Sequence, residues 1–442
     1  MEPLFLAVIC GCNAGLFREA LHDVYIPRIQ RGNAHFAAKA LGATGPLLSV
    51  LVHFFEHGRW GFLVEKGIDQ QGLVAEDQLF ILAQAGLYLT ATRGLGSPEA
   101  RICYELAEPL CHSLSRPLLL YVSLIGRWRY TLMIDKVFDA MQTAKRVYLL
   151  AQEQNDGALM LGAYRCLAAT FFFLGDFESG RQHAMCGVQI WRSGGVPSPV
   201  EEPITSVLSC LCYEALCEWH LGKTASCQAT MAETIALAKE LNDMHALVQA
   251  LWSAALLAHF ERNPAEVERL ASDFIERSTR HNFATWLPGG AALRGWACSA
   301  SGNTAEGISR IEDAIRDLMA TGAMLTTPYF LTLKAEALYL ANRTLEALEA
   351  VRVADRLVAR TAERWWYAEL HRLRAVFLTA LGADETLIEA LFYEAIGIAK
   401  QQKPISLEKR AQATYAEYRR QKASASGGRR FRLRLWYFLA AH

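Results

Sequence analysis

Apolar and small residues recur at helical spacing along most of the chain, whereas the alternation that is typical of strands is scarce. This spacing predicts helices over residues 76–92, 98–113, 137–152 and 406–422. The pair Ser97-Pro98 is a typical helix start. Residues 1–60 have a helical pattern as well, so the sequence predicts an all-α protein.

A period of 40 residues runs through the second half of the chain. Short turns line up at this interval, at Gly222, Arg262, Gly302, Asn342 and Gly382. Gly and Asn tolerate the left-handed backbone conformation that often follows a helix. We therefore expect each turn to join the two antiparallel helices of a hairpin.

A column of small residues precedes these turns by seven positions. An earlier unit shows the same pairing, with Ala168 before Gly175. Small side chains let two helices approach closely, so we place the column at helix crossings. Its members are Ala168, Ala215, Ala255, Gly295, Ala335 and Ala375. An amphipathic hairpin cannot bury its apolar face alone, so the predicted fold is an α-α superhelix of stacked hairpins.

The distribution of Gly, Pro and Ser predicts three regions. Residues 1–75 form an N-terminal helical segment that ends in the Gly-rich stretch Gly58–Gly72, and residues 76–422 form the repeat solenoid. Ser193–Pro203 is the clearest loop inside the solenoid. Residues 423–442 form a flexible basic-aromatic tail. In its segment Arg429–Phe438, arginines alternate with bulky apolar residues. Docking of this tail on an anionic membrane or on nucleic acid is the alternative.

The repeat resembles a known family. The tetratricopeptide motif uses a small residue seven positions before its turn, although its usual period is about 34 residues. Residues 76–420 are similar to the C-terminal tetratricopeptide region of large bacterial predicted ATPases and to the repeats of maltose-activator-type regulators. The similar strings are Leu89-Thr90-Ala91-Thr92-Arg93-Gly94, Ser97-Pro98-Glu99-Ala100, Phe173-Leu174-Gly175-Asp176-Phe177, Leu293-Arg294-Gly295-Trp296-Ala297, Ala320-Thr321-Gly322-Ala323, Pro328-Tyr329-Phe330-Leu331 and Glu363-Arg364-Trp365-Trp366-Tyr367-Ala368-Glu369-Leu370.

The resemblance implies a regulatory role rather than an activity. In such multidomain regulators the repeats follow an adenylate-cyclase or winged-helix domain and a nucleotide-binding ATPase module. Nothing in this sequence matches the cyclase or the ATPase module, so their activities do not carry over to it.

Composition agrees with a helical protein of balanced charge. Of 442 residues 52% are hydrophobic, and 45 Lys and Arg are matched by 45 Asp and Glu. A protein with this charge balance has no net positive charge to attract nucleic acid or an anionic membrane. The odd number of cysteines, 11, and their place in apolar helical segments indicate reduced, buried thiols and a cytoplasmic location.

We expect no membrane span, because polar residues interrupt every long apolar stretch. The apolar N-terminus, Met1–Cys12, lacks the basic residues of a signal peptide. The string Ile9-Cys10-Gly11-Cys12 loosely matches a lipoprotein box, which remains an alternative.

Gly222-Lys223-Thr224 ends like a phosphate-binding loop. That loop needs a first glycine five residues earlier, where this chain has Cys217, and a strand before it, where the pattern is helical. Gly222 is also a turn of the repeat. We therefore expect no nucleotide or other cofactor to bind here.

The densest set of metal-ligand residues is Cys210, Cys212, Cys217, His220 and Cys227. Structural zinc sites use paired C-x₂₋₄-C knuckles in loops, and this helical segment has none. Buried thiols are the better interpretation, with a metal site as the alternative. No catalytic motif is present either: the sequence has neither a nucleophile elbow nor a H-E-x-x-H helix.

Aromatic residues are the candidate partner contacts. Trp365, Trp366 and Tyr367 are consecutive, and on a helix they cannot all face one way because each residue turns by 100°. Core packing is the first interpretation, and contact with a ligand or peptide in a groove is the second. Trp128 and Tyr130 form a further basic-aromatic segment with the same two interpretations.

These observations favour a non-catalytic interaction or effector-sensing module. The expected partner is a protein or peptide, or a small effector in the concave groove, rather than nucleic acid or membrane. The alternative is the C-terminal fragment of an ATPase or nucleotide-cyclase enzyme whose catalytic domains lie outside this chain. The sequence predicts no catalytic, cofactor-binding or metal-ligating residue.

Overall fold

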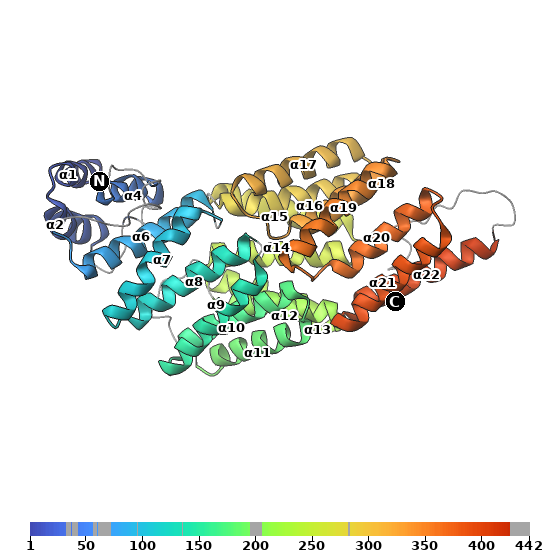
Figure 1. Cartoon of the computed structure of the whole chain (residues 1–442), viewed down its shortest axis with the longest axis horizontal. Helices are drawn as coiled ribbons and strands as arrows, with labels where there is room; N and C mark the ends of the chain where they lie inside the picture. Colours follow the sequence, from blue (N-terminus) through green and yellow to red (C-terminus); the bar gives the residue numbers. More distant parts are fainter. Residues whose placement is uncertain are drawn as a thin grey trace. The chain divides into compact units, whose positions relative to one another are not determined.

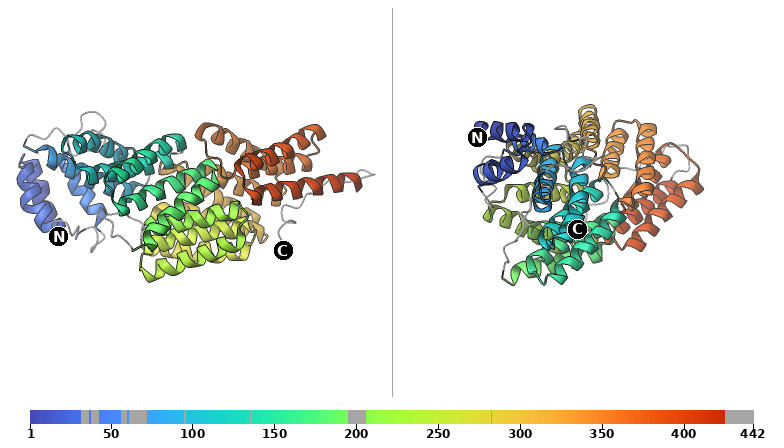
Figure 2. Two further views of the ribbon diagram at one scale, coloured as in Figure 1. Left: turned by 90° about the horizontal axis from the view of Figure 1, so that it is seen from below. Right: turned by 60° about the vertical axis from the view of Figure 1, so that its left-hand side comes forward.

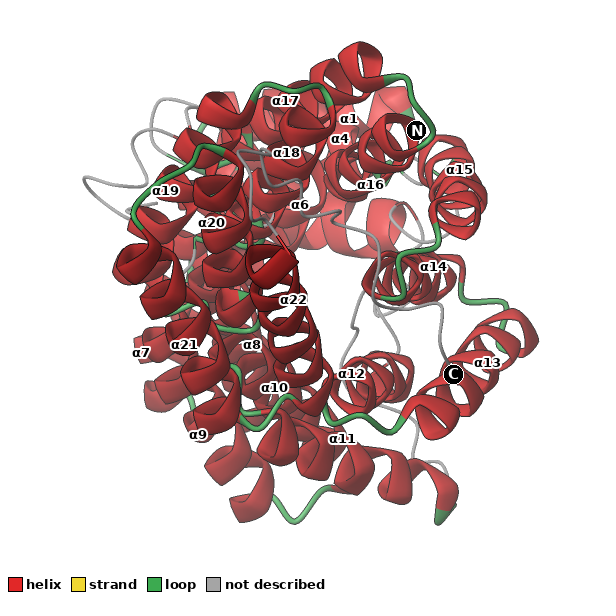
Figure 3. Ribbon diagram, turned by 90° about the vertical axis from the view of Figure 1, so that its right-hand side faces the viewer, coloured by secondary structure: helices red, strands yellow, loops and turns green. Residues whose placement is uncertain are grey.

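The computed structural model describes residues 1–31, 37, 43–55, 60, 72–94, 96–134, 136–194, 206–281 and 283–424. Every regular element in these ranges is a helix (Figure 3). The predicted all-α class is therefore confirmed. The chain divides into two compact units, which comprise mainly residues 1–134 and 155–424 of the described part.

The first unit begins with short helices and continues with longer ones (Figure 1). They are α1 (Glu2–Asn13), α2 (Phe17–Glu19), the π-helix η1 (Ala20–Gln30), α4 (Thr44–Leu51), the 3-10 turn η3 (Val52–Phe54), α6 (Ala75–Arg93), α7 (Pro98–Ser113) and α8 (Pro117–Met133). The C-terminal part of α9 (Val137–Glu153) also belongs to this unit. Ser97 caps α7 by accepting a hydrogen bond from the Ala100 amide, as its sequence predicts.

The second unit consists of longer helices joined by short turns. They are α10 (Gly157–Leu174), α11 (Phe177–Arg192), α12 (Ser206–His220), α13 (Thr224–Glu240), α14 (Met244–Phe260), α15 (Pro264–Arg280), the 3-10 turn η6 (Ala284–Trp286), α16 (Leu287–Ala300), α17 (Thr304–Ala320), α18 (Thr327–Leu340), α19 (Thr344–Thr361), α20 (Tyr367–Ala380), α21 (Glu385–Gln402) and α22 (Ile405–Ser424). Each even-numbered helix from α10 to α20 packs on the helix that follows it, and Figure 2 shows these hairpins side by side. The first helix of each hairpin also packs on the first helix of the next, as in a tetratricopeptide-like solenoid.

The hairpin turns have the conformation that their residues predict. The φ angles of Gly175, Gly222, Arg262, Gly302, Asn342 and Gly382 lie between 60° and 106°. In each hairpin, amides of the turn donate to carbonyls in the last turn of the first helix. After α12, for example, the Gly222 amide donates to the Trp219 carbonyl at 3.0 Å, and the Lys223 amide donates to the Glu218 carbonyl at 2.8 Å. Left-handed residues therefore end the first helices, at an interval of 40 residues from Gly222 onward.

The residues of the small column are buried. Ala168, Ala215, Ala335 and Ala375 are fully inaccessible, Ala255 is 1% exposed, and Gly295 is buried as well. A Cβ on Gly295 would lie 2.7 Å from both the Gly307 carbonyl oxygen and Ile311 Cγ1. Helices α16 and α17 therefore approach closely at this position.

Helix α10 is long and apolar enough to cross a membrane by length and composition alone. However, 72% of it is buried within the protein, where it packs on α11 and α12. Its apolar composition is thus accounted for by its place in the core.

Contacts between distant parts of the chain close the second unit. The Arg364 amide donates to the Phe173 carbonyl at 2.7 Å, and the Ser406 hydroxyl donates to the Trp219 carbonyl at 2.6 Å. Helix α22 thereby contacts both α20 and α12, and Figure 3 shows it between them.

The ranges 1–75, 76–422 and 423–442 stay predictions. Most of the expected loops Gly58–Gly72 and Ser193–Pro203, and the tail Arg429–Phe438, lie outside the described residues.

Candidate functional site

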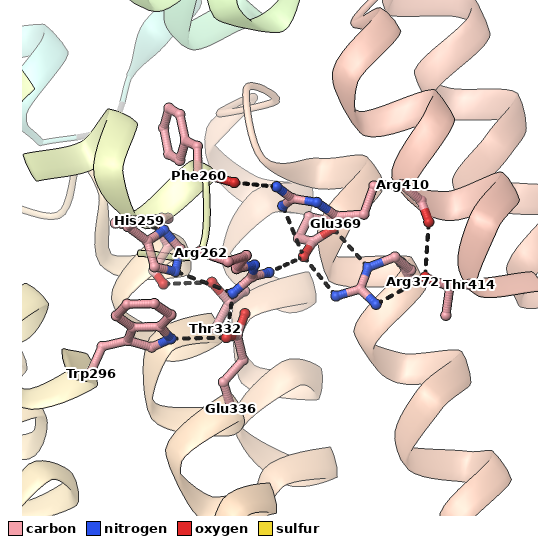
Figure 4. Close-up of polar contacts among 11 residues, drawn as sticks. His259, Phe260, Arg262, Trp296, Thr332, Glu336, Glu369, Arg372, Arg410 and Thr414 are labelled. Carbon is pink, nitrogen blue, oxygen red and sulfur yellow. Dashed lines mark hydrogen bonds and ion pairs between the residues drawn. The ribbon is translucent and has the colours of Figure 1, made fainter. Parts of the chain in front are cut away.

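The turn after α14 places a charged residue where the repeat otherwise has glycine or asparagine. Arg262 has a φ of 60°, and its amide donates to the His259 carbonyl as in the other turns. Its side chain is only 7% exposed. The guanidinium donates to Glu336 at 2.5 Å and to Glu369 at 2.6 Å (Figure 4). The turn therefore directs this side chain onto α18 and α20.

Glu369 of α20 is the centre of the resulting ionic cluster. Its two carboxylate oxygens accept from Nη2 and Nε of Arg372 at 2.8 Å each, a bidentate pair one helical turn apart. Oε1 also accepts from Arg262 and, at 3.3 Å, from Arg410. Burial raises the pKa of Glu369, but Arg372, Arg410 and Arg262 outweigh it and lower the pKa well below its usual range. This carboxyl is ionised at neutral pH.

Glu336 of α18 is fully buried and links the cluster to α16. Its Oε2 accepts from Arg262 and, at 2.9 Å, from the indole nitrogen of Trp296. Oε1 has no hydrogen-bond partner among the described residues. The polar atoms of the cluster are thus incompletely paired on this side.

Arg410 of α22 completes the cluster from the C-terminal side. Its guanidinium donates to the Phe260 carbonyl at 2.5 Å and lies over the rings of Trp219 and Trp366, 5.5 and 5.8 Å from their centroids. With Glu369, these groups surround the guanidinium with carbonyl, carboxylate and indole faces. We call Trp219, Phe260, Trp366 and Glu369 the arginine socket.

His259 and Tyr329 bind each other at the edge of the cluster, with 2.7 Å between the Tyr329 hydroxyl and His259 Nδ1. Burial, then Arg262 and Arg410, lowers the pKa of His259 well below its usual value. Burial and then Glu336 raise the pKa of Tyr329 well above its usual value. Both groups are therefore neutral at pH 7.

The ionisable groups of the cluster carry one net positive charge. Its members are three arginines (Arg262, Arg372, Arg410) and two glutamates (Glu336, Glu369). Burial, together with Arg262 and Arg372, lowers the pKa of Arg410 to about 10, although Glu369 and Glu336 act in the opposite direction. Arg410 is therefore the cation that the cluster stabilises least.

Aromatic rings line the cluster on the side of α10 and α12. His220 stacks on Phe177 with 3.9 Å between the centroids and an 8° angle between the planes. Both His220 ring nitrogens are buried without a hydrogen-bond partner among the described residues. Burial and then Arg410 lower the pKa of His220 well below its usual value, so this ring is packed as a neutral aromatic.

The interior next to the cluster has little free space. A cavity of about 10 Å³ is lined by Tyr329, Thr332, Trp366 and Leu370, among others. Such a cavity holds about one water molecule. The charged groups of the cluster therefore bind side chains of this protein. The cavity beside them is too small for a substrate molecule.

Two of the aromatic residues singled out in the sequence join the cluster. Trp365 is 1% and Trp366 4% exposed, and both precede α20 instead of lying on a helix as expected. The Trp365 ring packs on Phe172 with 5.2 Å between centroids, and Trp366 stacks on Phe260 at 4.8 Å. Both consecutive indoles therefore enter one core from a non-helical connection.

The other three candidate residues lie elsewhere. Tyr367 is the first residue of α20 and half-buried, with its ring 5.0 Å from the Arg364 guanidinium. Trp128 and Tyr130 lie on α8 in the first unit, Trp128 buried and Tyr130 half-buried under Arg101. Their role as partner contacts remains a prediction.

The cysteine-rich helix α12 has the packing of a core. Cys210, Cys212, Cys217 and Cys227 are at most 1% exposed, and burial raises the pKa of each thiol. In the described ranges, no group of three or more His, Cys, Asp or Glu residues could hold a metal ion. These thiols are protonated and act as small apolar side chains.

The Gly222-Lys223-Thr224 triplet lies in the turn between α12 and α13. Gly222 has a φ of 72°, the Lys223 side chain is exposed, and α13 starts at Thr224. The segment before the triplet is a helix and not the strand that a phosphate-binding loop requires.

The ionic cluster itself was not predicted. One signal is present in the sequence: Arg262 is the charged member of a column of Gly and Asn. A second signal is the position of Glu336 and Glu369 among apolar residues of their helices. Their shared partner Arg262 lies 74 and 107 residues away in the sequence, so local periodicity does not reveal the pairing.

No protein-family model matches the sequence. An uncharacterized protein of Rhizobium meliloti (strain 1021) is 24% identical over 276 residues, which are 62% of this chain and 27% of that protein. The chain thus spans about a quarter of the length of the relative it matches.

Two solved structures align with much of the chain. The crystal structure of a Rap protein complexed with Competence and Sporulation Factor covers 80% of this chain and 98% of its own, with a TM-score of 0.52 and 11% identity. A Signal Transduction ATPase with Numerous Domains from Pyrococcus horikoshii, which has a tetratricopeptide repeat sensor, covers 85% of this chain and 60% of its own, with a TM-score of 0.41 and 14% identity. The likeness to the Rap protein supports the tetratricopeptide-like solenoid.

Proposed function

We propose that this chain is a non-catalytic interaction and effector-sensing module, the regulatory part of a bacterial signalling ATPase or transcription regulator. The observation that carries the proposal is the ionic cluster on one side of the repeats. There the first helices α12, α14 and α20, with Trp366 just before α20, form what we call the first-helix face. This face presents carbonyls, a carboxylate and indoles to another helix, α22. These groups recognise a charged side chain without any bond-breaking chemistry.

The comparisons give two supporting observations. The Rap protein that shares this fold was crystallised with Competence and Sporulation Factor, which is a precedent for a factor bound to such a solenoid. The Rhizobium meliloti relative is much longer than the matched stretch, as expected if the repeats serve as one part of a larger regulator. We expect the partner to be a protein or peptide, and the module to act in the cytoplasm.

The second candidate is the C-terminal part of an ATPase or nucleotide-cyclase enzyme with its catalytic domains outside this chain. The length of the same relative favours it. The two candidates differ in the genomic sequence upstream of Met1. An in-frame nucleotide-binding domain there would assign the chain to such an enzyme as its regulatory region.

Photo-crosslinking in cells tests the interaction. Benzoylphenylalanine in place of Tyr367, a half-buried candidate contact, should give a discrete adduct with one partner. The same substitution at Tyr393, which is 59% exposed on the second helix α21, is the control and should not give that adduct. Identical adduct patterns at both positions, or none at Tyr367, would contradict the proposal.

A further inference from the structure

Helix α22 presents one polar face to the first-helix face. Ser406, Arg410 and Thr414 are four residues apart and therefore lie on the same side of the helix. Ser406 donates to the Trp219 carbonyl at 2.6 Å, and Thr414 accepts from Arg372 at 3.3 Å. Arg410 lies between them in the arginine socket. The contacts of this face are thus hydrogen bonds and ion pairs.

The apolar residues of α22 are buried as well, and one of them packs on α21. Leu407, Ala411 and Tyr418 are at most 4% exposed, and the Tyr418 ring lies 5.6 Å from that of Phe392 on α21. Helix α22 therefore contacts its sequence neighbour α21 through Tyr418, and has a second set of contacts, with α12, α14 and α20, through Ser406, Arg410 and Thr414. The second set is the one that another helix could replace.

The socket has the chemistry of a guanidinium site. Phe260 is the last residue of α14, where helix carbonyls lack intrahelical partners and carry partial negative charge, and its carbonyl accepts from Arg410. Two indole faces and the Glu369 carboxylate complete the shell. A planar cation with several donors satisfies carbonyl, carboxylate and rings together, which a lysine ammonium does less well.

The ionic cluster does not need Arg410 to be electrically neutral. Without it, Arg262 and Arg372 balance Glu336 and Glu369. Arg410 adds a buried positive charge, and the lowered pKa of its guanidinium is consistent with this cost. A buried carboxylate that loses its cation is strongly destabilised, whereas a second arginine in the socket would restore the same contacts. Exchange of Arg410 for another arginine therefore leaves no buried charge unpaired.

We propose that the arginine socket is a docking site for an arginine-bearing helix of a partner protein, and that α22 occupies it in cis. The partner helix supplies its own arginine in place of Arg410, flanked by small hydroxyl residues four positions away on either side. This inference rests on the proposed interaction function and assigns its site and the chemistry of its partner.

The test uses the full chain with a protease site inserted between Lys403 and Pro404. Lys403 is exposed and has a φ of 63°, so the insertion lies in a turn outside both helices. After cleavage and dialysis to remove the released C-terminal fragment, a fluorescent peptide of residues 404–424 is titrated and its anisotropy measured. The peptide should bind the cleaved chain at least tenfold more tightly than the uncleaved chain, where α22 occupies the socket.

Peptide variants determine whether the arginine decides binding. The Arg410→Ala peptide should bind the cleaved chain at least tenfold more weakly, and Arg410→Lys should restore little of the loss. Lys409→Ala is the matched control, because this neighbouring cation is exposed, and it should bind as the original peptide does. Equal binding of the Arg410→Ala peptide, or no binding of any peptide to the cleaved chain, overturns the inference.

The partner captured at Tyr367 separates this inference from the proposed function. If the inference is correct, that partner displaces the labelled peptide from the cleaved chain. A partner that crosslinks at Tyr367 but does not displace the peptide overturns the docking site and leaves the interaction function in place. Absence of any adduct contradicts the interaction function itself.

Discussion

Arg262 has a backbone conformation that is unfavourable for a side chain with a Cβ, by roughly 1–2 kcal/mol. Glycine occupies the equivalent turn position at residues 222, 302 and 382, and has no such cost there. The cost at Arg262 is offset by its two buried carboxylate partners. Its side chain, rather than its backbone, therefore explains why an arginine stands in this column.

Replacing Arg262 with glycine should separate the two effects. Arg262→Gly relieves the backbone but leaves Glu336 and Glu369 buried with fewer partners, a change that costs about 3–5 kcal/mol when a buried pair loses one member. We expect a net loss of about 1–4 kcal/mol in the free energy of unfolding, measured with urea. Asn342→Gly is the control, since that turn residue is exposed, and it should change stability by less than about 1 kcal/mol. A stabilised Arg262→Gly protein would refute the role of the cluster.

His220 should make stability depend on pH. The folded protein keeps this ring neutral, whereas the unfolded chain binds a proton near pH 6.5. The unfolded state thus binds more protons below that pH, so stability is complete above pH 6.5 and falls as the pH is lowered.

His220→Phe should reduce this dependence. Phenylalanine is suited to the site because Phe260 holds the equivalent position one repeat later. The slope of unfolding free energy against pH between 5 and 6.5 should decrease by up to one proton, about 1.4 kcal/mol per pH unit. Urea unfolding at pH 5.0, 6.0 and 7.5 measures the slope, and unchanged slopes would show that His220 takes up no proton on unfolding.

At the scale of the helices, much of the fold could be predicted from the sequence. The turns at Gly222, Gly302 and Gly382 have the left-handed conformation that glycine suggested, and α7 begins after its predicted cap. Helical spacing on both sides of Trp365 and Trp366 predicts a helix there, but in the structure both residues precede α20. The short connection before α20 is held by the Arg364–Phe173 hydrogen bond, a tertiary contact that local pattern does not reveal.

The close crossing of α16 and α17 gives a prediction at this scale. Gly295→Ala places a methyl group against the Gly307 carbonyl and Ile311, and should cost about 1–3 kcal/mol by overpacking. Gly397→Ala on α21 is the matched control, because nothing lies within 4 Å of its added Cβ and alanine favours a helix by about 0.5–1 kcal/mol. Thermal unfolding should shift in opposite directions for the two variants, and shifts of the same sign would contradict the crossing.

At the scale of the whole molecule, the chain should neither bind Mg-ATP tightly nor hydrolyse it. Lys223 lies in a hairpin turn after a helix, without the backbone cradle that phosphate binding needs. Calorimetry with Mg-ATP should show no binding in the micromolar range, and Lys223→Ala should change nothing. Micromolar binding that Lys223→Ala abolishes would favour the enzyme alternative.

The ionic cluster shows where prediction from sequence ends. The hairpins depend on contacts within about 40 residues, and a 40-residue period in the sequence reflects them. The cluster depends on how far the stacked hairpins turn before α22 meets α12 and α14. This total rotation is the sum of many small rotations between neighbouring repeats, so no local motif in the sequence reports it.

The long-range contacts of α22 also set an order of events during protein synthesis. Ser406 and Arg410 bind carbonyls that precede them by 187 and 150 residues. A ribosome that adds about 5–20 residues per second needs roughly 10–40 s to cover such a distance. Throughout this interval the Trp219 and Phe260 carbonyls lack the hydrogen bonds that Ser406 and Arg410 donate in the folded protein. We therefore expect the nascent chain to expose these groups until α22 emerges.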